Sequence, residues 1–522
     1  MAAGTVASRA TGLVRQVLQA GALGTGLLAT TYNQANTVPA SLYFLIIGGA
    51  LNSVLVPQLV RARLEQPDGG RAFEQRLVTL TLAVLGTGSL LAVWAAPQII
   101  GVYQRDTPGN HAAFELTVVF ARFLLPQIFF YGMYGILGQV LNARNRFGAM
   151  MWTPVLNNLL LIAVFGWYAG AMTAADGVHG ITPAQVTLLG AGTTLALAVQ
   201  AVALGPFVRA AGFRFRPRFD WRGTGLRASL GAARWTLLFV LANLVAATFV
   251  TRYATAADRA LPRAGVGFTA YTYAQTIWSL PQSVVTVTLV TALLPRMSRA
   301  VAEHREDDMR RDLSHALRTS GVVIVPVAFF FLALGPQLAQ LLFAHGAADA
   351  AATRPLGRML QAFGPGLIPF SAQYVLLRGF YAFGDTRTPF LMALWTGAVQ
   401  VALATGCHLL LPARWAVTGM AAAYGIAYAV GLLLTARLLR RRMAGRLDAR
   451  RVVGAYGRLV GAALVAGAAG RVAAALCPAP PGSPAVAAAL SLAAGGGAML
   501  LLFLLLARVW GSVGPRGLPG PR

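Results

Sequence analysis

Two arginines lie six residues apart near the start of the chain, in an apolar run that contains SRATGLVRQ. They are Arg9 and Arg15. A guanidinium inside a membrane span is costly and usually faces a cavity or a partner, and its planar fork matches the oxygens of a diphosphate. Six helical residues turn through about 600°, so the two arginines do not share one face. Gly12 between them permits a bend or a close neighbour. The alternative is that both side chains extend to the lipid headgroups.

A group of amide side chains follows in the next apolar run. Asn33, Gln34 and Asn36 lie close to Pro39, which breaks the regular hydrogen bonding of a helix. These amides suit hydrogen bonds to a sugar or a diphosphate. They equally suit bonds between helices, worth about 1 kcal/mol or less each. Both interpretations stay open at this point.

Three charged residues fall in short turns between apolar runs. They are Arg146, Asp385 and Arg387, and we interpret them as turn or gate elements rather than as substrate ligands. Asp385 suits the cap of a turn, and the arginines suit lipid phosphates. Aromatic residues are common at membrane interfaces, so we expect interface anchors at the three tryptophans Trp152, Trp278 and Trp415.

The sequence lacks the known signatures of catalysis. We find no Walker A loop, GxSxG, HExxH or pair of carboxylates within one apolar run, and nearly all of the 16 acidic and 6 His residues lie in connectors. We therefore predict no enzyme, no cofactor and no metal site. Cys407 and Cys477 show no metal-binding spacing; a disulfide between them is conceivable, but apolar packing suits both.

The composition is that of a polytopic membrane protein. The chain has 522 residues, of which 57% are hydrophobic and 11% are charged. Its apolar runs approach the roughly 20 residues that cross a bilayer as a helix, and they lack the alternation of barrel strands. The net charge of +27 comes from arginines in the connectors. We attribute it to membrane orientation rather than to nucleic-acid binding.

We predict an all-α protein of about 14 transmembrane helices, with no cleavable signal peptide. Connectors after the even-numbered spans, with the C-terminus, carry roughly thirty arginines, and the others about seven. The positive-inside rule then places both termini in the cytoplasm. The predicted spans are 2–24, 31–60, 77–100, 112–141, 149–170, 184–208, 228–252, 267–295, 312–343, 356–383, 388–411, 415–437, 453–476 and 485–508.

A weak internal repeat divides the chain into two pseudo-symmetric lobes of six helices. Pro57 matches Pro295 and Arg146 matches Arg387, both at an offset of about 240 residues, as expected for repeated transporter halves. We predict an N-terminal lobe at 1–210, a basic cytoplasmic linker at 211–227 and a C-terminal lobe at 228–440. Residues 441–522 would add two helices and a cytoplasmic tail.

Five segments follow one another between about residues 5 and 390: SRATGLVRQ, YNQANTVP, LNARNRFGAMMWTPVLNN, YAQTIWSLPQSV and LRGFYAFGDTRTP. In sequence and order they resemble segments of the MviN/MurJ lipid II flippases, particularly the actinobacterial branch. The resemblance implies the multidrug/oligosaccharidyl-lipid/polysaccharide exporter fold. It also implies a cation-lined cavity in which Arg9 and Arg15 bind the substrate diphosphate.

The chain departs from the family pattern at three positions of the implied cavity. Thr30 stands where the family has an acidic residue, and Tyr43 stands where many members have an arginine. A further family arginine aligns near Thr276, beside Gln275. We count Tyr43, Gln275 and Thr276 among the candidate substrate-binding residues, together with Arg9, Arg15, Asn33 and Asn36.

The spans that carry cation-binding carboxylates in some family members carry none here. Neither 228–252 nor 388–411 contains an acidic residue. An ion-coupled transporter normally needs an ionisable or oxygen-rich site within the membrane. We therefore predict no carboxylate-based cation site, which leaves the membrane potential as the physical candidate for coupling.

The resemblance implies that the chain moves undecaprenyl-diphosphate-linked peptidoglycan precursor, lipid II, across the bacterial inner membrane by alternating access. The alternatives are export of another lipid-linked glycan or a drug, and a non-transporting scaffold of the cell-wall machinery. The expected partners are lipid II, membrane lipids and cell-wall synthesis proteins, without nucleic acid, and the expected state is a monomer.

Overall fold

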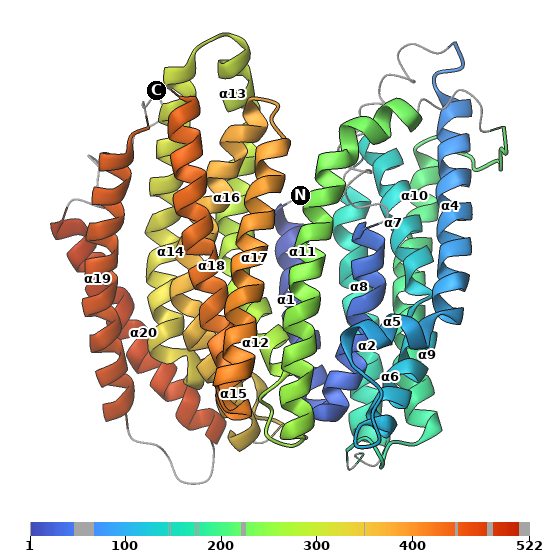
Figure 1. Cartoon of the computed structure of the whole chain (residues 1–522), viewed down its shortest axis with the longest axis horizontal. Helices are drawn as coiled ribbons and strands as arrows, with labels where there is room; N and C mark the ends of the chain where they lie inside the picture. The colour runs from blue at the N-terminus through green and yellow to red at the C-terminus, as the bar shows by residue number, and fades with distance from the viewer. Residues whose placement is uncertain are drawn as a thin grey trace. The chain divides into compact units, whose positions relative to one another are not determined.

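The computed structural model describes most of the chain as helices (Figure 1). The described residues are 2–45, 67–144, 146, 148–172, 175, 177–220, 226–348, 350–443, 447–477 and 484–510. No strand occurs among them. The predicted all-α class is confirmed. The chain divides into two compact units, Met1–Thr255 and Ala256–Arg522.

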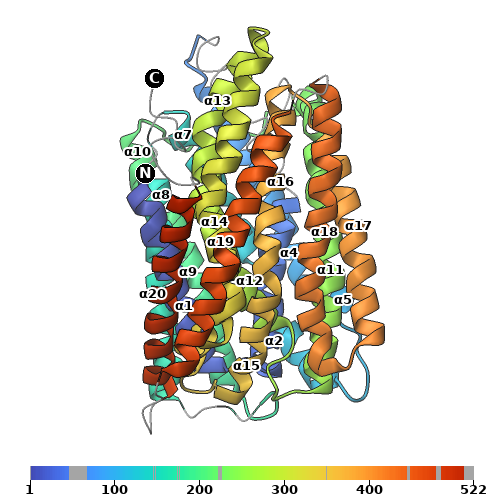
Figure 2. The ribbon, with the colours of Figure 1, turned by 90° about the vertical axis from the view of Figure 1, so that its left-hand side faces the viewer.

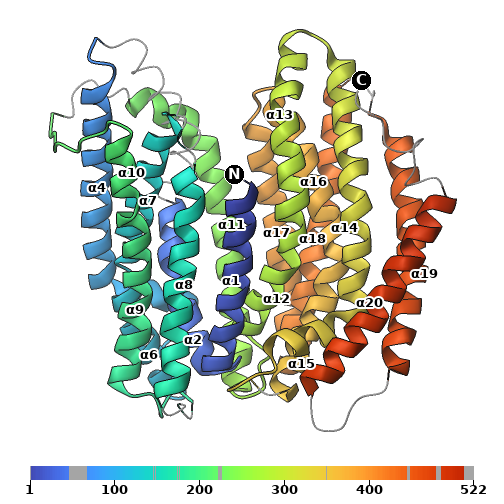
Figure 3. The same cartoon turned by 180° about the vertical axis from the view of Figure 1, so that it is seen from behind.

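The first unit is a bundle built around an apolar core. Figure 3 shows α1 running along α8, and α2 packs mainly on α6. Tyr32, Phe120 and Phe165 are among its fully buried side chains. The helices are α1 (Ala2–Leu23), α2 (Leu27–Tyr43), α4 (Arg71–Trp94), α5 (Ala96–Tyr103), α6 (His111–Leu124), α7 (Gln127–Asn142), α8 (Gly148–Ala171), α9 (Pro183–Val202), α10 (Leu204–Ala210) and α11 (Leu226–Ala260), the last of which continues into the second unit.

The second unit contains the remaining helices. In Figure 2, α19 and α20 lie beside α14, and the three pack together around Val325, Leu459 and Phe503. The elements are α12 (Phe268–Pro281), the π-helix η3 (Gln282–Thr286), α13 (Val287–Ala302), α14 (Glu306–Phe343), α15 (Ala350–Phe363), the 3₁₀ turn η4 (Gly364–Gly366), α16 (Leu367–Ala382), α17 (Arg387–Leu410), α18 (Ala413–Arg442), α19 (Ala449–Leu476) and α20 (Pro484–Val509).

Eleven helices within the described part of the chain are long and apolar enough to cross a membrane. They correspond to eleven of the predicted spans, and the count of 14 is not confirmed. The other three predicted spans, 2–24, 31–60 and 356–383, correspond to α1, to α2 and to the segment from α15 to α16. Residues 46–60 of the second of these spans lie outside the described part. Arg9 and Arg15 lower the hydropathy of α1, as Arg354 and Arg358 do for α15.

Prolines lie at two helix boundaries, whereas α2 and α13 continue through Pro39 and Pro295. Pro126 separates α6 from α7, and Pro281 is followed at once by the π-helical turn η3. Within α14, Pro336 has no amide hydrogen to donate to the carbonyl of Leu332. Gln361 of α15 supplies that donor instead, at 2.8 Å. The carbonyl group left without a helix partner by Pro336 is therefore bonded by a side chain of a neighbouring helix.

Glycines allow two pairs of helix backbones to touch in the second unit. A Cβ added at Gly425 would lie 2.8 Å from the Cα of Gly366, and one at Gly470 would lie 2.7 Å from the carbonyl oxygen of Gly495. Only glycine permits such an approach, which strengthens the packing between membrane helices. Gly48 and Gly49, which suggest the same role in sequence, lie outside the described residues.

The two helix ends that the proposed repeat matches, after α7 and after α16, terminate with the same type of backbone hydrogen bond. The amide of Arg146 donates to the carbonyl of Leu141, and that of Asp385 donates to the carbonyl of Phe380, both at 2.9 Å. This six-residue closure is a Schellman motif. It also ends α10 and α13, so it does not by itself establish the repeat. Pro57, the other marker, lies outside the described residues.

Candidate functional site

Helix α1 is fixed to α8 by hydrogen bonds as well as by packing. The side-chain amide of Asn158 donates to the carbonyl of Ser8 at 3.0 Å and to the hydroxyl of Thr11 at 3.1 Å. A Cβ added at Gly12 would lie 3.5 Å from the same amide. Gly12 therefore faces a close neighbour, one of its two predicted roles. These contacts determine where Arg9 and Arg15 lie.

The two arginines of α1 differ in their surroundings. Arg9 is exposed, whereas Arg15 is half-buried. The Nε of Arg15 is buried and has no hydrogen-bond partner among the described residues. Arg15 also interacts electrostatically with Tyr32 of α2 and Tyr131 of α7. The guanidinium of Arg15 thus retains an unused donor inside the unit.

The aromatic neighbours of Arg15 are well fixed. The hydroxyl of Tyr32 shares a hydrogen bond of 2.6 Å with Thr193, and its ring meets Phe120 edge-on. Tyr131 stacks on Tyr43, with ring centroids 5.7 Å apart and an interplanar angle of 23°. Tyr43, where the family resemblance implies an arginine, therefore belongs to the same group of side chains as Arg15.

The amides of α2 make contacts between helices. Asn33 accepts from Gln19 of α1 at 2.6 Å, and Asn36 accepts from Gln127 at 3.4 Å. The buried Gln34 finds no partner for either side-chain atom within the described part of the chain. Interhelical bonding, the alternative considered for Asn33 and Asn36, is therefore present. Pro39 is buried within α2. Substrate binding by these residues stays a prediction.

The two candidates of the second unit lie on α12. Gln275 is half-buried and interacts with the hydroxyl of Tyr424. Thr276 is exposed, and its hydroxyl donates to the carbonyl of Thr272 at 2.8 Å. Trp278, expected at the membrane interface, is instead 1% exposed. It packs against Phe363 and the other rings of an aromatic core, so the prediction for Trp278 was wrong.

The turn between α16 and α17 is organised by Asp385. Its carboxylate accepts hydrogen bonds from the amides of Arg387 and Thr388, both at 3.0 Å, and from Arg442 at 3.4 Å. Partial burial alone would raise the pKa of Asp385, but these bonds and charges lower it below its usual value. Asp385 therefore caps this turn, and its role as a gate element stays a prediction. Arg146 and Arg387 are exposed in their turns.

The first unit contains a buried ion pair that was not predicted from the sequence. Glu74, in the first turn of α4, is fully buried, and its carboxylate lies 2.6 Å from Arg144 at the end of α7. The guanidinium of Arg144 also donates to the carbonyl of Val140 and lies 5.6 Å from the ring of Phe213. An acidic residue in the first turn of a helix was the only available signal.

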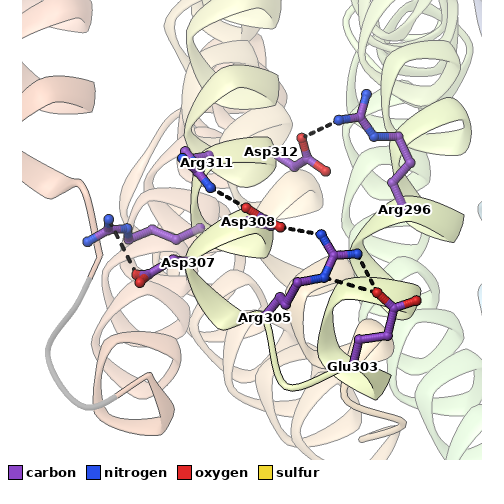
Figure 4. A network of polar contacts seen from close by, with 8 residues as sticks. Arg296, Glu303, Arg305, Asp307, Asp308, Arg311 and Asp312 are labelled. Carbon is purple, nitrogen blue, oxygen red and sulfur yellow. Dashed lines mark hydrogen bonds and ion pairs between the residues drawn. The ribbon is translucent and has the colours of Figure 1, made fainter. Parts of the chain in front are cut away.

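Ion pairs that range from exposed to half-buried join α13, α14 and the start of α19. Figure 4 shows Arg305 between Glu303 and Asp308, and Arg296 beside Asp312 at 3.3 Å. Arg310 lies 3.8 Å from Asp448, which precedes α19. Water screens the exposed pairs, such as Arg305 with Glu303, so individually these contribute little to stability.

No group of three or more His, Cys, Asp or Glu that could hold a metal ion occurs among the described residues. Cys407 and Cys477 are both free thiols, so the structure contains no disulfide between them.

Sequence comparison assigns the chain to a family. A family profile described as "Lipid II flippase MurJ" matches residues 19–508. The chain belongs to the MurJ family. A relative from Rhizobium meliloti, named "Probable lipid II flippase MurJ", is 30% identical over 452 residues, which cover 85% of this chain and 80% of the relative. A "Lipid II flippase MurJ" from Burkholderia cenocepacia is 26% identical over 396 residues, covering 75% and 73%.

Solved structures support the fold of a MurJ-family protein. The structure titled "Lipid II flippase MurJ, inward closed conformation" aligns with a TM-score of 0.76, covering 97% of both chains at 16% identity. An inward-facing multidrug resistance MATE transporter of the MOP superfamily aligns with a TM-score of 0.67, covering 84% of this chain and 94% of the transporter at 17% identity. The predicted family and exporter fold are confirmed, and this chain is a multi-pass inner-membrane protein. Its branch within the MurJ family stays a prediction.

Proposed function

We propose that this chain flips lipid II across the inner membrane. The observation that carries the proposal is the match to the MurJ profile over nearly the whole chain, from residue 19 to 508. Relatives at 30% and 26% identity bear the name lipid II flippase. Flipping moves a lipid without making or breaking a covalent bond, so the proposal assigns the chain no catalytic residue.

Arg15 is the proposed principal ligand of the substrate diphosphate. Its buried Nε lacks a partner among the described residues, and a buried donor left unpaired costs free energy until an acceptor arrives. A diphosphate would supply such acceptors in a geometry that suits a guanidinium. Arg9 lies about 9 Å from Arg15 along the helix axis, so it would contact the same diphosphate at a different stage of transport.

The proposed transport mechanism is alternating access between two lobes. The diphosphate headgroup would cross within the protein while the polyprenyl tail stays in the lipid. Both termini would lie in the cytoplasm, as the distribution of arginines predicts. We propose a monomer as the transporting unit, with cell-wall synthesis proteins as partners. The membrane potential acting on the bound substrate would provide the driving force.

Complementation of a flippase-depleted bacterium tests the proposal. The wild-type chain should restore growth, and Arg15→Ala should abolish the rescue because it removes the proposed ligand. Arg15→Lys keeps the charge but loses the planar fork, so it should rescue partially. Arg440→Ala is the matched control, since it removes an exposed arginine from the end of α18.

Expression in the membrane must be equal for all variants. Full rescue by Arg15→Ala together with Arg9→Ala would contradict the proposed ligands while leaving flipping intact. Failure of the well-expressed wild-type chain to rescue would contradict lipid II flipping itself. That outcome would favour a scaffold or another lipid-linked glycan, in line with the neutral residues at Thr30, Tyr43 and Thr276.

A further inference from the structure

A segment of alternating basic and aromatic residues follows α10 in the first unit. The segment Phe213–Asp220 reads FRFRPRFD and contains neither helix nor strand. Every residue of the segment except Phe213 is exposed. Arginine and phenylalanine side chains are therefore both available at the surface of the unit.

The segment is attached to the unit at both of its ends. Phe213 is 4% exposed and lies under Arg144. Gln75 of α4 donates to the carbonyl of Arg214 at 3.2 Å, and Asp220 accepts from the Nε of Arg76 at 2.8 Å. The arrangement is thus fixed by contacts with α4 and α7.

These attachments place the segment at a membrane surface. It begins three residues after the candidate span Pro183–Ala210 ends, and it contacts the first turns of the candidate span Arg71–Trp94. The end of one span and the start of another mark the same face of the bilayer. Residues held against both must lie at the level of the headgroups.

The outward-facing groups of the segment match that environment. Phe215 and Phe219 are 48% and 66% exposed, an unfavourable state in water that insertion among headgroups would relieve. The arginine side chains are also exposed, and Arg218 already interacts with Asp68 and Asp220. Arg214 and Arg216 form no ion pair with any described residue.

We propose that Phe213–Asp220 binds the headgroups of anionic phospholipids, with Arg214 and Arg216 on the lipid phosphates and the rings of Phe215 and Phe219 among the headgroups. Charge complementarity favours this partner, because arginines beside an anionic membrane surface attract its lipids. The exposed rings favour a bilayer over a soluble anion. The proposal uses the membrane placement of the chain and is independent of lipid II transport.

The test measures binding of phosphatidylglycerol to the full-length protein. Phe215→Cys carries an environment-sensitive fluorophore, with Cys407→Ser and Cys477→Ser removing the native thiols. In uncharged detergent, added phosphatidylglycerol should shift the emission to the blue, whereas phosphatidylcholine should not. Arg214→Gln with Arg216→Gln should raise the half-saturating lipid concentration by about 25-fold, since each arginine contributes roughly fivefold.

Two further variants keep the result interpretable. Arg214→Lys with Arg216→Lys keeps both charges and should bind nearly as well as the parent. Arg440→Gln with Arg441→Gln removes the same charge from the exposed end of α18 and should leave the lipid titration at Phe215 unchanged. An equal effect of this control would overturn the proposal, because the response would then report net charge. A shift with inorganic phosphate alone would overturn it too. No lipid II is present, so the outcome does not depend on the proposed function.

Discussion

Replacement of Arg144 by Met should destabilise the first unit strongly. The partner carboxylate of Glu74 is fully buried, lies 2.6 Å from the guanidinium and has no partner for its other oxygen among the described residues. The variant would leave that carboxylate charged and unpaired in an apolar setting. Breaking a buried pair in this way costs about 3–5 kcal/mol. For a unit of this size, a loss of that order lowers the Tm by roughly 10 °C.

A double variant separates the ion pair from the packing of Arg144. Glu74→Met combined with Arg144→Met removes both charges and should recover most of the lost stability, since burying two apolar side chains avoids the desolvation of two ions. The measurement is thermal unfolding of the purified protein in one detergent, with both single variants completing the cycle. Arg76→Met is the control. It breaks the pair with Asp220, whose side chain is 54% exposed, and should change the Tm only slightly.

Either of two results would show that the unpaired charge of Glu74 does not destabilise the first unit. If Arg144→Met changed the Tm no more than Arg76→Met does, the buried carboxylate would have another way to be stabilised. If the double variant were as unstable as Arg144→Met alone, the loss would come from the contacts of Arg144 with Val140 and Phe213 and not from the unpaired charge.

Three further predictions concern single positions. Asp385→Asn should lower the free energy of unfolding near neutral pH. Because the folded pKa of Asp385 lies below its ordinary value of 3.8, this difference from wild type should persist above about pH 4 and disappear as the pH falls through the folded pKa. Unfolding measured across this pH range tests the prediction. Gly425→Ala should cost about 1–3 kcal/mol by overpacking against Gly366, whereas Gly406→Ala, which has nothing within 4 Å of its Cβ, should be neutral in the same unfolding assay. Tyr43→Arg, which restores the cation implied by the family resemblance, should strengthen binding of lipid II in a direct titration; unchanged or weaker binding would remove Tyr43 from the proposed site.

The sequence predicted the elements that depend on local properties. Long apolar runs become helices because a backbone in lipid must satisfy its own hydrogen bonds. Asp385 caps its turn for an equally local reason: its carboxylate reaches the amides two and three residues ahead.

Features that depend on distant partners could not be predicted in this way. Glu74 and Arg144 are 70 residues apart in sequence, and nothing near either residue indicates the other. Trp278 illustrates a different limit. Hydropathy is the same for a ring that faces lipid and for one that faces Phe363 and Tyr424, because the interior of a membrane protein and the lipid around it are both apolar.

The surroundings of three arginines within helical bundles distinguish structural roles from a functional one. Arg144 bonds to Glu74 and to a backbone carbonyl, and Arg471 of α19 donates to the carbonyl of Ala333, three residues before Pro336 in α14. Both arginines donate hydrogen bonds to groups of the protein itself, as expected of a buried group that stabilises the fold. Arg15 does not, since its buried Nε finds no acceptor in the described part of the chain. A buried guanidinium with an unpaired donor is unfavourable in free energy. Its presence is best explained by an acceptor that belongs to a bound ligand. That is the physical basis for choosing Arg15, rather than Arg144 or Arg471, as the ligand of a diphosphate.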